Sequence, residues 1–328
     1  MTQVDLNQEF GQATEPFRRE LLAHCYRMVG SASEAEDLVQ ETMLRAWRAY
    51  GRFDPARGGT RTWLYKIATN ACLSWLESRP ARTLPSALGG PSTDPSLGPA
   101  HTEVPWLQPL PDVWLASPSD PANLAVRRDT VRLAFVAALQ HLPARQRAVL
   151  LLREVLAWSA SEVADLLDTT TAAVNSALQR ARAHLDRLAP RDDDLLDLPD
   201  PRLRRLLENY VKAFEEANVG ALVGLLREDV LTEMPPSLTW FSGRDATIGF
   251  AAAVFSRHGA GTRQMLGTSA NGQPALAMYS LQEDGLFHGS HVQVLDISAG
   301  GIFRITAFNY PEFVAIFGLP ETLPPRRD

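Results

Sequence analysis

Apolar and polar residues in the first 80 positions follow the period of amphipathic helices. This spacing predicts helices over residues 13–29, 32–50 and 60–78. A break at Gly30-Ser31 separates the first two, and either Ser31 or Ser33 can cap the second. The third helix has an apolar stripe made of Trp63, Leu64, Ile67, Ala71 and Trp75. Its other face carries Arg61, Lys66 and Asn70.

The helical pattern stops at Pro80. Ten prolines fall between Pro80 and Pro121, which excludes a continuous helix there and indicates an extended linker. This linker also holds apolar residues that are unusual in a free linker, and we expect them to dock on a folded domain. They are Trp106, Leu107, Leu110, Val113, Trp114 and Leu115. Helices are predicted again at about 123–141 and 144–157.

A pair of short helices follows, with the pattern of a DNA-binding helix-turn-helix. The first helix is predicted over 159–167, the turn is Asp168-Thr169-Thr170, and the second helix runs from Thr171 to about residue 188. Asp168 stands where many such turns carry glycine, and Thr170 or Thr171 can cap the second helix. Apolar residues form one stripe of that helix, while the opposite side carries Ala172, Ser176, Gln179, Arg180 and Arg187. A helix pair that only packs against its neighbours remains the alternative.

The last part of the chain predicts helices followed by strands. Helices are expected over 202–217, 219–227 and from Gly243 to about residue 257. Alternating segments at 262–270, 274–282, 286–297 and 301–308 are joined by turns that contain Gly272, Gly285 and Gly301. Helices followed by hairpin-linked strands indicate an α+β domain with an antiparallel sheet.

Composition and charge are those of a globular protein with several domains. The chain has 328 residues, is 45% apolar, and contains no run of 18 apolar residues that could span a membrane. Residues 191–328 carry 12 basic and 18 acidic groups, so the net charge of −6 lies in that part, which is therefore poorly suited to bind DNA. Cys25 and Cys72 lack the spacing of zinc ligands, and we predict no metal site and no cofactor.

Three separated motifs in one order resemble bacterial RNA polymerase sigma factors of the extracytoplasmic-function class. The first is Ala35-Glu36-Asp37-Leu38-Val39-Gln40-Glu41-Thr42 with Arg45-Ala46-Trp47, and the second is Thr62-Trp63-Leu64-Tyr65-Lys66-Ile67-Ala68-Thr69-Asn70. The third is Leu142-Pro143-Ala144-Arg145-Gln146-Arg147 before the helix-turn-helix. The resemblance covers residues 10–190.

The resemblance implies three binding surfaces. The first binds core RNA polymerase and consists of Asp37, Gln40, Glu41 and Arg45. The second captures the unpaired strand of the minus-ten promoter element and consists of Arg61, Trp63, Lys66 and Asn70, although Trp63 could equally be a core residue. The third reads the minus-thirty-five element and consists of Thr171, Ala172, Ser176, Gln179 and Arg180. The resemblance also suggests that the linker threads polymerase channels between the two promoter elements.

The C-terminal part is similar to SnoaL-like domains of the nuclear-transport-factor-two superfamily. The segments that carry this resemblance are Met234-Pro235-Pro236 and Trp240-Phe241-Ser242-Gly243-Arg244-Asp245. The segment from Phe308 to Phe313 resembles a regulatory motif of fused domains, which implies a regulatory contact through Asn309, Pro311 and Phe313. Because the superfamily includes enzymes, Glu233, His288, His291 and Asp296 are candidates for acid–base chemistry by residue type alone. We assign no catalytic residue.

These expectations combine into one interpretation. The fold class is multi-domain, with two all-α sigma domains and an α+β SnoaL-like cone. The predicted parts are 1–79, a Pro-rich linker 80–122, the helix-turn-helix domain 123–190, an acidic linker 191–201 and the SnoaL-like domain 202–328. The protein is expected to be a cytoplasmic sigma factor, not an enzyme, whose partners are core RNA polymerase, promoter DNA and a small ligand that the C-terminal domain could take. The alternatives are a SnoaL-like isomerase, cyclase or hydrolase fused to a DNA-binding module, and an ordinary repressor.

Overall fold

The computed structural model describes residues 3–54, 59–115, 130–188, 195 and 200–326. The chain divides into two compact units, and each is described by itself. Unit 1 consists of residues 1–82 and 114–190, and unit 2 consists of residues 83–113 and 191–328. The Pro-rich segment 83–113 therefore clusters with the C-terminal domain and not with the helices on either side of it.

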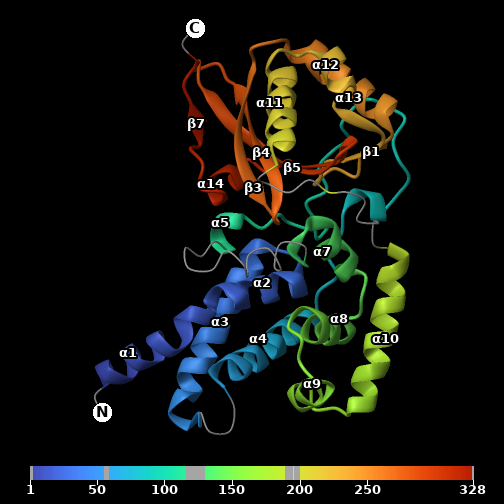
Figure 1. Ribbon diagram of the computed structural model, residues 1–328. Coiled ribbons are helices and arrows are strands. Elements are labelled where there is room, and N and C mark those ends of the chain that lie inside the picture. The colour runs from blue at the N-terminus through green and yellow to red at the C-terminus, as the bar shows by residue number, and fades with distance from the viewer. Residues whose placement is uncertain (1–2, 55–58, 116–129, 189–194, 196–199, 327–328) are drawn as a thin grey trace. The chain divides into compact units, whose positions relative to one another are not determined.

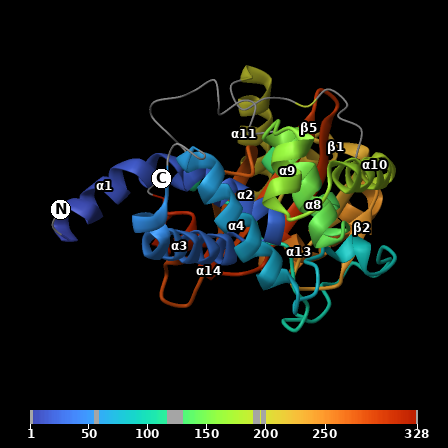
Figure 2. The same ribbon diagram turned by 90° about the horizontal axis from the view of Figure 1, so that it is seen from below.

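Unit 1 begins with helices that pack side by side. The helix α1 spans Gln3–Thr14, α2 spans Arg18–Val29, α3 spans Ala32–Ala49 and α4 spans Thr60–Leu76. A 3-10 turn at Glu15–Phe17 separates α1 from α2, so the single helix expected over 13–29 is wrong at its start; Pro16 lies in this turn and interrupts the helix. Figure 2 shows α2, α3 and α4 beside one another. Gly30 ends α2 in a left-handed conformation, and Ser31, one of the two candidate caps, caps α3.

The second half of unit 1 is also helical. The helix α7 spans Leu133–Gln140, α8 spans Ala144–Leu150 and continues as a π-helical turn to Val155, α9 spans Ala160–Leu166, and α10 spans Thr171–Leu188. The start expected for the first of these helices, near residue 123, lies outside the described residues.

Polar side chains fasten α2 to the second group of helices. Arg147 of α8 is buried and donates hydrogen bonds to the carbonyl of Met28 and to the side chain of Gln140. Gln140 donates in turn to the carbonyl of Arg27, and Arg27 donates to both oxygens of Thr130. The two helical groups of unit 1 are therefore joined by hydrogen bonds that are largely removed from water.

Unit 2 is a curved sheet with helices on one face (Figure 1). These helices are α11 (Pro201–Glu215), α12 (Val219–Val223) and α13 (Arg244–His258), whereas the short α14 (Glu312–Ile316) does not belong to the core cluster that they form with the sheet. The strands are β1 (Leu226–Glu233), β2 (Trp240–Ser242), β3 (Arg263–Ala270), β4 (Gln273–Leu281), β5 (Phe287–Ser298), β6 (Gly301–Phe308) and β7 (Thr322–Leu323). Their order is β2-β1-β6-β5-β4-β3, with β7 on β5. Neighbouring strands are antiparallel except β1 and β6, which are parallel.

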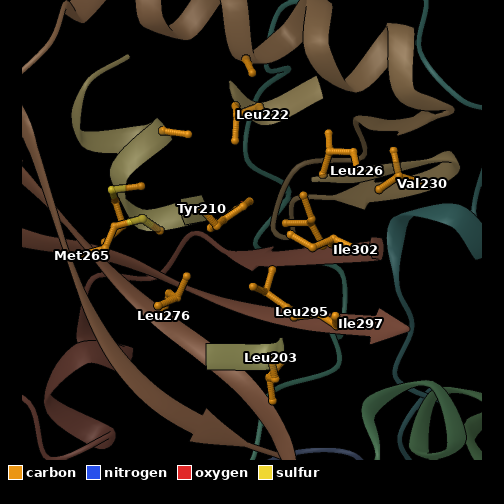
Figure 3. Close-up of a cluster of buried hydrophobic side chains, with 14 of the residues drawn as sticks. Leu203, Tyr210, Leu222, Leu226, Val230, Met265, Leu276, Leu295, Ile297 and Ile302 are labelled. Atoms are coloured by element: carbon orange, nitrogen blue, oxygen red, sulfur yellow. The ribbon is translucent and has the colours of Figure 1, made fainter. Parts of the chain in front are cut away.

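The sheet buries both of its faces. Because successive side chains of a strand point to opposite faces, Leu276, Leu295 and Ile305 all face the helices. There they pack with Tyr210 and Leu222. In the close-up of Figure 3, Tyr210 of α11 lies between Leu222 and Leu276. The opposite face consists of the intervening residues, which are also buried: Glu233, Ala275, Ala277, Val292, Val294, Asp296, Thr306 and Phe308.

The expected helix over 219–227 is wrong in its second half. The helix α12 ends at Val223, and β1 begins at Leu226. Short apolar runs fit helix and strand equally well, and β1 is fixed as a strand by its pairing with β2 and β6. The strands expected at 262–270, 274–282, 286–297 and 301–308 are present within one residue of those bounds.

Candidate nucleic-acid interface

The proposed polymerase surface is one face of α3. Leu38, Val39, Thr42 and Ala46 are buried on the inner face of this helix. On the other face Asp37, Gln40 and Arg45 are exposed and Glu41 is half-buried. The spacing of three and four residues places these four side chains on one face, as expected. Glu41 Oε1 accepts a hydrogen bond from Arg45 Nε at 2.7 Å. Of the two carboxylates on this face, Asp37 is therefore the one without a partner among the described contacts.

The neighbouring carboxylates of α3 are engaged inside unit 1. Glu36 pairs with Arg18, and Glu34 pairs with Arg82 at the end of the first helical group. These carboxylates therefore hold α3 against its surroundings, and they are less available to a partner protein than Asp37.

The proposed minus-ten surface lies on α4. Lys66 and Asn70 are exposed, and Trp63 is half-buried. The Trp63 ring stacks on Phe53, with ring centroids 4.3 Å apart and planes 20° apart, next to Tyr50. Trp63 is therefore both part of an aromatic cluster and partly open to solvent, an arrangement that can hold a stacked base.

Arg61 has a structural partner. Its guanidinium makes three hydrogen bonds of 3.0–3.1 Å to the Glu20 carboxylate and lies over the Tyr65 ring, with 39% of the side chain exposed. Close by, His24 is buried and hydrogen-bonded to the Thr69 hydroxyl. Burial lowers the pKa of His24 to about 3, and the nearby positive charges add to this effect, so the ring is neutral at physiological pH.

The helix-turn-helix forms as its sequence indicates. Ser159 and Glu162 make a capping box at the start of α9, and Asp168 in the turn has a left-handed φ of 49°. Thr170 caps α10, because its hydroxyl accepts a hydrogen bond from the amide of Ala173. Val174, Leu178 and Ala181 form the buried stripe. Residues Thr171, Ala172, Gln179 and Arg180 are exposed, and Ser176 is half-buried.

One residue of the proposed minus-ten surface contacts the first helix of the helix-turn-helix. The Lys66 ammonium donates a hydrogen bond of 3.3 Å to the backbone carbonyl of Asp165 in α9. This contact occupies a cation of α4 that the minus-ten surface would need.

The candidate acid–base residues of unit 2 lie in three separate places. Glu233 and Asp296 lie on the sheet face away from the helices, where both carboxylates face Arg304 at 3.0 and 3.9 Å. His288 pairs with Asp284. His291 faces the helices beside Gln293 in a cavity that holds none of these carboxylates. This arrangement does not supply the acid–base pair that an isomerase or cyclase would use.

The residues proposed for a regulatory contact adjoin the same sheet. The Asn309 amide N–H donates to the carbonyl of Pro235, and its side chain donates to the carbonyl of Met234. Pro311 precedes α14 and is exposed, whereas Phe313 is buried and packs near Phe308. The described contacts of Asn309 and Phe313 lie within unit 2.

The Pro-rich segment is held along its length by unit 2. The amide of Ser86 donates to Glu233 Oε1, the amide of Gly98 donates to the Thr239 hydroxyl, and the amide of Leu110 donates to Asn271 Oδ1, each at 2.9 Å. Trp106, Leu107 and Leu110 are buried, so the expected docking is confirmed for these three. Val113 is 64% exposed, and Trp114 and Leu115 are half-buried and belong to unit 1. Bridges join Ala100 to Ser237 and Pro111 to Ala270. The sequence alone does not reveal this docking, because the acceptors lie more than 130 positions further along the chain.

The described residues contain no cluster of three or more metal-ligating side chains. Within the same ranges, no helix is long and apolar enough to cross a membrane.

Comparison with known proteins identifies the family. Residues 14–81 match Sigma-70 region 2, and residues 132–185 match Sigma-70 region 4. The chain is 48% identical over 317 residues to the ECF RNA polymerase sigma factor SigG of Mycobacterium tuberculosis, covering 96% of this chain and 85% of that protein. The chain belongs to the extracytoplasmic-function RNA polymerase sigma factors. It is thus a transcription initiation factor, not an enzyme, and it binds core RNA polymerase and promoter DNA.

A second relative extends the comparison to the C-terminal domain. SigJ of M. tuberculosis is 26% identical over 253 residues, covering 75% of this sigma factor and 73% of SigJ. The crystal structure of SigJ has the same fold, with a TM-score of 0.62 at 21% identity, over 94% of this chain and 98% of that one. The resemblance to an extracytoplasmic-function sigma factor is confirmed, as is the fold class of helical sigma domains followed by an α+β domain.

Proposed function

We propose that this sigma factor contacts polymerase and promoter through three surfaces of its helical domains, 1–79 and 123–190. In this proposal the SnoaL-like domain 202–328, reached through the acidic linker 191–201, controls activity by holding the Pro-rich linker 80–122. The observation that carries the regulatory part is the docking of residues 83–113 on unit 2. The protein would act in the cytoplasm, where bacterial polymerase and DNA are found.

The polymerase surface of the proposal is Asp37, Gln40, Glu41 and Arg45. Its exposure on α3, beside carboxylates already paired within the domain, supports this assignment. Changing Asp37 and Glu41 together to Lys should reduce capture of core polymerase at least tenfold, because two attractive charges become repulsive ones. The control is a double variant that combines Glu9→Lys with Asp186→Lys. It makes the same change of charge on other helices and should leave capture of core polymerase intact. Equal capture of both double variants would refute this assignment.

The DNA surfaces of the proposal are Arg61, Trp63, Lys66 and Asn70 on α4 and Thr171, Ala172, Ser176, Gln179 and Arg180 on α10. The partly exposed Trp63 ring and the exposed Asn70 support contact with an unpaired strand. In this proposal Lys66 joins that contact once its hydrogen bond to the Asp165 carbonyl is broken. The exposed small and polar face of α10 supports reading of base edges in a major groove.

The linker provides the means of control. It joins the two DNA-binding domains, which must separate to reach two promoter elements. While residues 83–113 are docked on unit 2, they cannot extend between those domains or follow a channel of polymerase. Release of the linker should therefore precede productive binding, and a docking free energy of about 1–3 kcal/mol is enough to regulate activity. In this proposal the regulatory residues Asn309, Pro311 and Phe313 act within unit 2. Asn309 bonds to the carbonyls of Met234 and Pro235. The next carbonyl, that of Pro236, accepts the amide of His101 in the linker.

The decisive experiment weakens docking without disturbing the fold. Asn271→Gly keeps the left-handed backbone at φ 58° and removes the acceptor of the Leu110 amide. Thr239→Val removes the acceptor of the Gly98 amide. Each lost hydrogen bond costs about 0.5–1.5 kcal/mol, so run-off transcription with core polymerase should rise about 2- to 10-fold.

Thr262→Val is the matched control, because its hydroxyl bonds only the carbonyl of Gly259 among the described residues. Transcription that is unchanged in both docking variants, at equal polymerase binding, would overturn control through the linker.

A further inference from the structure

The SnoaL-like domain encloses a cavity of about 270 Å³ between its helices and its sheet. The walls are mainly apolar and come from α11, α12, α13 and the strands; among them are Phe214, Leu222, Phe250, Phe255, Met278 and Ile305. Figure 3 shows the adjoining core, with Leu222 and Leu226 near Tyr210. Since an apolar cavity of about 150 Å³ holds benzene, this one has room for a molecule of about two rings.

One end of the cavity is polar and ordered by a chain of hydrogen bonds. The Tyr210 hydroxyl donates to Gln293 Oε1 at 2.9 Å, and Gln293 Nε2 donates to His291 Nε2 at 3.0 Å. His291 Nδ1 then donates to the Ser290 hydroxyl, which donates to the carbonyl of Met278. The Gln293 amide has two N–H groups, of which the bond to His291 uses one. The other can serve an acceptor on a ligand.

The charge of the cavity limits what it can hold. No described residue of its lining is an aspartate or a glutamate. Burial, followed by the charge of Arg263, lowers the pKa of His291 to about 4, so this ring is neutral at physiological pH. Arg263 is held by the carbonyls of Val254 and Gly259 and adds positive potential. A cation would enter without a counter-charge, whereas a neutral or anionic molecule meets no repulsion.

The linker forms part of this cavity. Pro95, Ser96 and Leu97 belong to its lining, and Leu97 is 47% exposed. The linker is anchored on both sides of these residues, by the Ser92 amide on the carbonyl of Trp240 and by the Gly98 amide on Thr239. A molecule in the cavity therefore contacts the docked linker directly, and these contacts disappear when the linker leaves. Binding that depends on the docked form must stabilise that form.

We propose that this cavity binds a small, largely apolar, neutral or anionic molecule with a hydrogen-bond acceptor, and that the bound molecule holds the linker docked. The second half of this inference rests on the function proposed above, and the first half does not. The described lining holds no carboxylate that could form an acid–base pair with His291, so we propose the cavity as a binding site.

The binding test uses 2-naphthol and 2-naphthoate as probes and the full chain as receptor. Isothermal titration should give one saturable site for at least one of them, with at least tenfold weaker binding of 2-naphthylmethylammonium. Ala253→Phe places a ring in the cavity, whereas Ala252→Phe enlarges the next residue of α13, which is not part of the lining. The first variant should lose at least tenfold in affinity and the second should keep it.

A second variant addresses the polar end. Gln293→Leu keeps the size of the side chain, removes the free N–H, and should lower affinity several-fold. Absence of saturable binding by both probes, or equal binding to the Ala252 and Ala253 variants, would overturn the ligand site.

The coupling test measures amide hydrogen exchange of the linker. At saturation with the bound probe, exchange of the Gly98 and Leu110 amides should slow at least threefold, and it should not slow in Ala253→Phe. Binding without any change in linker exchange would refute the coupling while leaving the site intact. Linker protection without a fall in run-off transcription would instead contradict the function proposed above.

Discussion

Arg147 allows a stringent test of how the two helical groups of unit 1 are joined. Its side chain is buried, has no carboxylate partner in the part of the chain that the structure describes, and is surrounded by oxygens of Met28, Gln140 and Leu142. Burial lowers its pKa to about 10, so the guanidinium still carries its charge at neutral pH. The change to examine is Arg147→Met, which preserves most of the buried volume and removes every one of these hydrogen bonds.

The expected cost follows from two opposing terms. Hydrogen bonds to a charged group contribute about 1.5–3 kcal/mol each, and four are present. Against this stands the desolvation of the guanidinium, which is several kcal/mol. Because removal leaves buried carbonyl groups without these donors, we expect a net loss of about 3 kcal/mol in the free energy of unfolding.

Urea unfolding of the full chain, followed by helical circular dichroism, measures this loss. With an m-value of about 1–3 kcal/mol per molar urea, the midpoint of the unit 1 transition should fall by about 1–3 M. Arg145→Met is the matched control, because Arg145 lies on the same helix and is exposed. Arg147→Lys keeps the charge without the planar guanidinium fork, and its urea midpoint should lie between the midpoints of the two methionine variants. Equal midpoints for the Arg145 and Arg147 methionine variants would refute this reasoning.

Two further predictions concern DNA and pH. Arg180→Ala should weaken duplex binding across sequences and lower the salt slope by about 1, whereas Gln179→Ala should change preference at one base pair by about 1–3 kcal/mol. Competition binding at several salt concentrations checks both predictions. If Gln179→Ala weakens binding equally on every sequence, Gln179 does not contact the bases. For His291, the folded-state pKa of about 4 lies below the unfolded value of 6.5, so the unfolded state binds more protons in between and stability falls as pH drops through that window. From pH 7 to pH 5 this should cost about 2 kcal/mol of stability, and His291→Gln should abolish that loss. The control His288→Gln, at a half-buried histidine outside the cavity, should keep it. Equal pH dependence in both variants would contradict the buried neutral ring.

The sequence by itself determined the local elements and the family. Periods of 3.6 and 2 residues reflect which side of a helix or strand meets the core, and they located α3, α4, α10 and the hairpins from β3 to β6. Caps such as Ser31 and Thr170 are local contacts, so neighbouring residues narrowed each of them to two candidates. The order of motifs on these helices was enough to identify a sigma factor.

Tertiary structure alone decided what the linker and the buried polar groups do. The strand β1 exists because β6 lies beside it, and the amide of Leu110 finds its partner in Asn271. The sequence offers Glu233, Asp296 and His291 equally as candidates for acid–base chemistry. In the structure the two carboxylates lie on one face of the sheet and the imidazole lies on the other. Such pairings join residues far apart in the chain and depend on the closing of the whole sheet, so no local pattern records them.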